Sequence, residues 1–203
     1  MYKDLPPRYR DILRRYYELI DGYEFFCYSV TTPLTLSEAV RRIGMEEKDL
    51  LPSKGHGTLA EHGCLLIGQV GPAVVTFDAT GTGRFLRTTD TLAKGCDYGV
   101  VQWDDYNLVF DYIGRDGGGG GWDDELEMAE SVAALRDGSL AEYADLFARF
   151  VEAYEASEED EVDPVVYLQA LMLTVLELET GVRVDDQVID GLSYALHIPA
   201  NLR

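Results

Sequence analysis

The sequence has few cysteines and no long apolar segment, and both shortages exclude classes of protein. Its 203 residues include 3 cysteines, Cys27, Cys64 and Cys96. This odd number at wide spacings is unlike the framework of a disulfide-stabilised secreted domain. The longest apolar runs, residues 64–70 and 72–77, are too short to cross a bilayer, and the charged start of the chain is unlike a signal peptide. We therefore expect a cytoplasmic protein with no membrane partner.

Basic residues are also scarce, with 17 Lys and Arg against 37 Asp and Glu, a net charge of −20. Residues 1–54 hold 9 of each sign, whereas residues 122–203 hold 4 basic and 20 acidic residues, which is −16 of the total. Such a field repels nucleic acid and anionic lipid and attracts basic proteins. The 46% hydrophobic content is ordinary for a globular protein, so we expect the chain to fold.

Hydrophobic periodicity predicts an α+β fold. Helical spacing marks residues 5–20, whose arginines either form a solvated face or dock on the acidic C-terminal half. Strand signals mark residues 23–30, 64–70, 73–77, 96–103 and 107–113, with short helices at 36–43 and 84–94 between them. Helical spacing returns in residues 126–135, 140–154, 165–178 and 185–196. We expect a mostly antiparallel sheet of about five strands with short helices, followed by a C-terminal helical region packed on it.

A run of five consecutive glycines at residues 117–121 interrupts these patterns. Such a run has no conformational preference of its own, which predicts a flexible connector or a loop tip. We expect a sheet domain in residues 1–116 and an acidic helical region in residues 122–203, the two packing as one unit.

No motif predicts an active site, a metal site or a cofactor. The loop with Lys54, His56, Glu61, His62 and Cys64 lacks the closely paired ligands of a zinc site, so loop histidines and a core cysteine are favoured. The glycines at residues 81–83 are not followed by the lysine and hydroxyl of a phosphate-binding loop.

Four aspartates near strand ends form another candidate cluster, and paired carboxylates can share acid/base work or hold a hard cation. They are Asp104, Asp105, Asp111 and Asp116. No nucleophile or histidine accompanies them, so a role in turns is favoured. We assign no catalytic residue.

Acidic residues beside aromatic residues are the best candidates for binding a partner, although core packing is the default for any one aromatic side chain. Charge complementarity raises association rates, and aromatic anchors supply much of the affinity. The candidate residues are Trp122, Asp123, Asp124, Glu125, Tyr154, Glu155, Glu158, Glu159, Asp160, Glu161 and Asp163. The alternative interpretation of these charges is a solvated loop between helices.

Several short motifs together resemble an uncharacterised family of actinobacterial proteins. They are Gly22 and Tyr23 before the aromatic strand, the segments 36–44 and 64–78, and the Thr-Gly-Val-Arg-Val sequence at 180–184. The resemblance spans most of residues 22–184, and it implies no catalytic residues. Small acidic proteins of this type are similar to immunity or conflict-system proteins.

Three functions remain open on the sequence. The leading hypothesis is a non-enzymatic protein that neutralises or regulates a basic partner, such as a toxin or nuclease, through the acidic C-terminal face. The first alternative is a DNA mimic that inhibits a nucleic-acid-binding defence complex. The second is a small-ligand domain or enzyme with a pocket between sheet and helices, using His56, His62 or Asp111.

Overall fold

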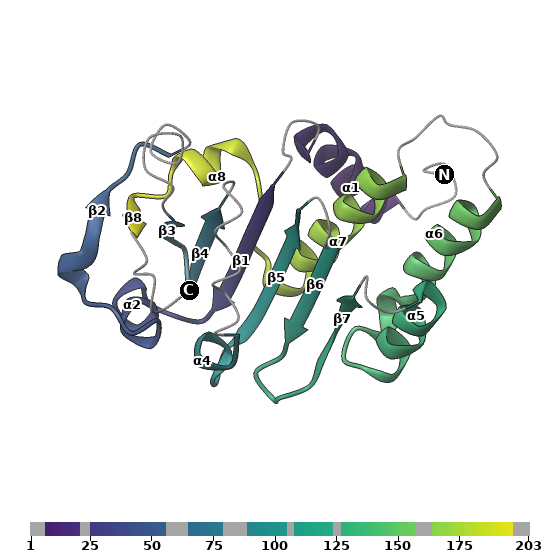
Figure 1. Cartoon of the computed structure of the whole chain (residues 1–203), viewed down its shortest axis with the longest axis horizontal. Coiled ribbons are helices and arrows are strands. Elements are labelled where there is room, and N and C mark those ends of the chain that lie inside the picture. The colour runs from purple at the N-terminus through teal and green to yellow at the C-terminus, as the bar shows by residue number, and fades with distance from the viewer. Residues whose placement is uncertain are drawn as a thin grey trace.

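The computed structural model describes residues 7–20, 25–55, 65–78, 89–104, 108–123, 127–156 and 164–196. In these residues eight strands form one sheet, in the order β2-β8-β3-β4-β1-β5-β6-β7 (Figure 1). Each described strand pair is antiparallel. The strands are β1 (Phe26–Thr32), β2 (Leu50–Pro52), β3 (Leu65–Val70), β4 (Ala73–Asp78), β5 (Asp97–Trp103), β6 (Leu108–Ile113), β7 (Gly119–Asp123) and β8 (Tyr194–Leu196).

Helices cover both faces of this sheet. They are α1 (Pro7–Ile20), α2 (Leu36–Arg42), α4 (Thr89–Ala93), α5 (Met128–Asp137), α6 (Ala144–Ala156), α7 (Pro164–Thr180) and α8 (Asp186–Asp190), with 3-10 turns η1 (Glu47–Asp49) and η3 (Ala141–Tyr143). In Figure 1, α5 and α6 stand beside β7 at one end of the molecule, and β2 lies at the other end.

Alternation along the strands divides the buried side chains into two cores. On β1, Phe26, Tyr28 and Val30 enter the larger core, which α1, α5, α6 and α7 cover. Cys27, between them, enters the smaller core beneath α2 and α4. Successive strand residues point to opposite faces, so a strand covered on both sides becomes almost wholly buried. Helix α7 lies deepest, with apolar residues on every side.

Local signals fix the ends of several elements. Helix α2 begins after Thr35, whose side chain accepts a hydrogen bond from the Glu38 amide at 3.3 Å. The chain leaves this helix through Gly44, at a φ of 87°. Gly71, at a φ of 57°, forms the turn between the antiparallel strands β3 and β4.

The α+β class and the antiparallel sheet are confirmed, but the expected strand number is wrong. The sheet has eight strands rather than about five, and its helices are interspersed along the chain rather than gathered at the C-terminal end. The segment expected to be a fourth C-terminal helix contains the short α8 and then β8. Strands of three residues are too short to show alternation in a sequence.

The glycine run differs from expectation in part, because Gly119, Gly120 and Gly121 belong to β7, whereas Gly117 and Gly118 lie in the turn between β6 and β7. Gly121 pairs with Asp111 of β6. A Cβ atom on Gly121 would lie 2.2 Å from the carbonyl oxygen of Phe110, so the close approach of two strands requires glycine there. The division into residues 1–116 and 122–203 stays a prediction, although strands and C-terminal helices share the larger core.

Candidate functional site

The helices beside β7 carry an acidic surface. Every charged residue of the described segment 127–156 is exposed, with seven carboxylates against two arginines. The residues are Glu127, Glu130, Asp137, Glu142, Asp145, Glu152 and Glu155, with Arg136 and Arg149. We call these nine residues the acidic face. Arg136 pairs with Asp145 at 3.3 Å, whereas Glu142, Glu152 and Glu155 form no ion pair in the described part of the chain.

Core packing holds this face in place. Phe147, Phe150 and Val151 of α6 are buried in the larger core, which leaves the other side of the helix to solvent. Trp122 of β7 stacks on Phe147, with ring centroids 5.4 Å apart, and meets Phe150 edge-on at 6.3 Å. The acidic side chains therefore project from a fixed backbone.

The structure places the predicted partner-binding residues unevenly. Trp122 is 3% exposed and lies in the core. Tyr154 and Glu155 are exposed at the end of α6, and Asp123 ends β7. Seven predicted residues lie outside the described residues, namely Asp124, Glu125, Glu158, Glu159, Asp160, Glu161 and Asp163.

Sequence reasoning missed the acidic residues between 127 and 152. It gave weight to consecutive charges, while these carboxylates occur singly among apolar residues. The available signal was the polar half of the helical period in residues 126–154, because the side opposite an apolar stripe faces solvent.

A second group of polar side chains lies on the sheet face beneath α2 and α4. Ser29 of β1 and Thr76 of β4 are both buried, and their hydroxyl oxygens are 2.7 Å apart. On neighbouring strands, Cys27 lies opposite Asp78. Asp111 lies opposite Val100 of β5, on the same face. The structure thus groups Asp111 with residues that sequence reasoning had not connected to it.

The reactive groups of this second cluster are held in their neutral forms. Burial, and then the nearby Asp78, raises the pKa of the Cys27 thiol. Burial, followed by the Cys27 and Asp111 charges, raises the pKa of the Tyr98 hydroxyl. The Ser29 side chain has a smaller, opposite effect on this pKa. The Tyr98 hydroxyl has no hydrogen-bond partner of normal geometry in the described structure. A protonated thiol and phenol are poor nucleophiles, so this cluster gives little support to enzymatic chemistry.

The other residues considered for chemistry divide between described and undescribed segments. Asp116 accepts a hydrogen bond from the Gly118 amide at 3.0 Å, as a turn residue does. His56, Glu61, His62, Cys64 and Asp105, with the glycines at 81–83, lie outside the described residues. Within the described ranges, no group of three or more His, Cys, Asp or Glu side chains could hold a metal ion.

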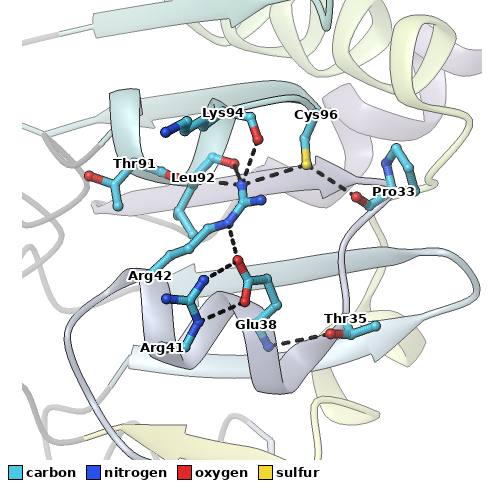
Figure 2. A network of polar contacts seen from close by, with 9 residues as sticks. All are labelled: Pro33, Thr35, Glu38, Arg41, Arg42, Thr91, Leu92, Lys94 and Cys96. Atoms are coloured by element: carbon cyan, nitrogen blue, oxygen red, sulfur yellow. Dashed lines mark hydrogen bonds and ion pairs between the residues drawn. The ribbon is translucent and has the colours of Figure 1, made fainter.

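A network around Arg42 joins α2 to the end of α4 (Figure 2). The Arg42 Nη1 atom donates to the carbonyls of Leu92 at 2.8 Å and Lys94 at 2.9 Å, and Nε donates to Glu38 at 2.9 Å. Arg41 and Arg42 lower the pKa of Glu38 to about 2. The Cys96 thiol donates to the Pro33 carbonyl at 3.1 Å. Arg42 thus supplies donors to carbonyls at a helix C-terminus, which is a structural role.

Another hydrogen-bond network docks α1 on the C-terminal half of the chain. Arg15 and the Tyr16 hydroxyl both donate to the Glu177 carboxylate of α7. The Tyr16 hydroxyl also accepts a hydrogen bond from the Val184 amide at 3.0 Å. Arg14, in contrast, is exposed and pairs with Glu18 of its own helix. The arginines of α1 therefore include both a docked residue and a solvated one.

Comparisons with known proteins add no relative. No protein-family model, curated protein or solved structure matches this chain. Among the described helices, none is long and apolar enough to cross a membrane.

Proposed function

We propose that this protein binds a basic protein partner through the acidic face and thereby neutralises or regulates it, as immunity proteins do. The observation that carries the proposal is the imbalance of seven exposed carboxylates against two exposed arginines between residues 127 and 156. A concentration of one sign of charge steers an oppositely charged partner and favours its orientation.

The state of the carboxylates supports this role. Glu142, Glu152 and Glu155 form no ion pair in the described structure, so no basic residue of the described ranges neutralises them. They project from elements anchored by the larger core. A fixed array of charges loses less conformational entropy on binding than charges on a flexible segment.

The test compares two variants with the same change in net charge. E142Q/E152Q/E155Q removes three negative charges from the acidic face. D186K/Q187K changes the net charge by the same amount at two exposed positions of α8, away from α5 and α6 (Figure 1). Each immobilised protein is exposed to lysate from the source organism, and retained proteins are identified by mass spectrometry after washes of increasing salt.

We expect the wild-type protein and D186K/Q187K to retain the same basic protein, and E142Q/E152Q/E155Q to lose most of it. Retention should fall as salt rises, because exposed charge interactions are screened. Equal retention by all three proteins would contradict the proposal. Displacement of the partner by duplex DNA would identify its nucleic-acid site as the bound surface, as a DNA mimic requires.

A further inference from the structure

The end of the core between α6 and α7 leaves two large apolar side chains exposed. Tyr154, in the last turn of α6, is 43% exposed, and Val165, in the first turn of α7, is 51% exposed. Tyr154 continues the buried stripe formed by Phe147, Phe150 and Val151, since its position follows theirs at helical spacing. We call Tyr154 and Val165 the apolar end.

Aromatic packing holds the Tyr154 ring from within. Its centroid lies 6.0 Å from that of Phe150. Phe150 in turn stacks on Tyr167 of α7, at 5.9 Å and an interplanar angle of 10°, and also meets Trp122. The exposed ring is therefore joined to an aromatic cluster that reaches into the core. A ring held in this way loses little freedom when a partner covers it, which is typical of interface anchors.

The charge around the apolar end is negative. Glu155 follows Tyr154 directly, Glu152 lies two residues before it, and both carboxylates are exposed. Burial raises the pKa of Tyr167 to about 12, and the charge of Arg149, an exposed residue of α6, opposes this rise. An apolar centre with a charged rim has the composition of a protein-binding surface.

We propose that the apolar end is the anchor point of the acidic face, and that it binds a basic segment of the partner carrying an apolar or aromatic side chain among its lysines or arginines. This inference rests on the proposed function and specifies the partner's chemistry. Charge complementarity selects the basic segment, and contact with Tyr154 and Val165 selects the apolar side chain within it.

Two synthetic peptides of equal length and charge test this inference. One contains only lysine and glycine, and in the other some glycines are replaced by tryptophan and leucine. Affinities are measured by fluorescence anisotropy with the full chain at low salt. We expect the wild-type protein to bind the tryptophan-containing peptide about tenfold more tightly, the effect of one good interface anchor.

The variants separate the apolar end from other apolar surface. Y154S/V165S should bind both peptides equally while keeping the wild-type affinity for the lysine-glycine peptide. The control L51S/Y194S, at two other exposed apolar residues on β2 and β8, should retain the tenfold preference. Circular dichroism confirms that each variant is folded.

The possible failures are distinct. If the wild-type protein binds the two peptides equally, or if Y154S/V165S keeps the preference, the inference about the apolar end is wrong while the proposed function stands. If neither peptide binds, or if E142Q/E152Q/E155Q binds the lysine-glycine peptide as tightly as wild type does, the acidic face is not a binding surface and both proposals fail.

Discussion

At the scale of single residues, two tyrosines of the larger core show how hydrogen bonding decides what a buried hydroxyl contributes. Tyr16 and Tyr28 are both fully buried. The Tyr16 hydroxyl bonds to Glu177 and to the Val184 amide, whereas the Tyr28 hydroxyl has no partner in the described structure. Burial raises the pKa of both hydroxyls, so each is neutral in the folded protein at physiological pH.

The two hydroxyls predict opposite effects of the same substitution. Tyr16→Phe should lower the free energy of unfolding by about 1–3 kcal/mol, because it leaves the buried Val184 amide without an acceptor. Tyr28→Phe should leave stability unchanged or raise it, because it removes an unsatisfied polar group. Urea unfolding followed by circular dichroism measures both. A larger loss for Tyr28→Phe than for Tyr16→Phe would show that the hydrogen bonding is different from that described.

At the scale of secondary-structure elements, strand β7 offers a matched pair of glycines. A Cβ atom on Gly121 would lie 2.2 Å from the Phe110 carbonyl oxygen, but one on Gly120 would make ordinary contact with Leu140 at 3.5 Å or more. The atoms that the Cβ of Gly120 would contact belong to the side chain of the buried residue Leu140. The atoms that the Cβ of Gly121 would contact belong to the backbone of the neighbouring strand β6.

Gly121→Ala should therefore destabilise the protein by about 2 kcal/mol or more, since strands β6 and β7 must separate to admit the methyl group. Gly120→Ala should change the free energy of unfolding by less than about 0.5 kcal/mol, since it introduces no clash. The measurement is again urea unfolding. If both variants are neutral, β7 does not pair with β6 as described, and the glycine run is the flexible connector that its composition suggests.

The Arg42 network shows why a sequence identifies elements more easily than their contacts. The cap at Thr35 and the stop at Gly44 are local, and the sequence predicts α2 from them. The Leu92 and Lys94 carbonyls lie about fifty residues away in the chain, and no pattern in α2 indicates that its last arginine contacts them. Only the packing of α2 beside α4 brings these groups together.

At the scale of the whole molecule, the net charge of −20 opposes folding. Exposed carboxylates are closer together in the folded state than in the expanded chain, and salt screens their repulsion. Raising sodium chloride from 10 to 500 mM should therefore stabilise the protein by about 1 kcal/mol, the scale of a few surface charge interactions.

The acidic face should account for part of this salt effect. E142Q/E152Q/E155Q, measured by thermal unfolding over the same salt range, should gain less stability than wild type. D186K/Q187K serves as the comparison for the same change in net charge at another location. An equal gain in wild type and E142Q/E152Q/E155Q would mean that repulsion on this face is too weak to affect folding.

The sequence by itself determined the α+β class, the antiparallel sheet and the strongly negative charge. These properties depend on composition and on periodicity within short segments, which each segment carries without reference to the others. The same reasoning located acidic residues near the end of α6, although much of that predicted set lies outside the described residues.

The tertiary structure alone decided the rest. Strand β8 exists because β3 supplies a partner, β2 exists because β8 does, and Gly119–Asp123 becomes β7 because β6 supplies one. Trp122, a candidate for partner binding, is buried because α6 covers it, while Tyr154 is exposed at the end of the α6 stripe. Burial and pairing depend on residues distant in the chain, so a pattern read along one segment does not contain them.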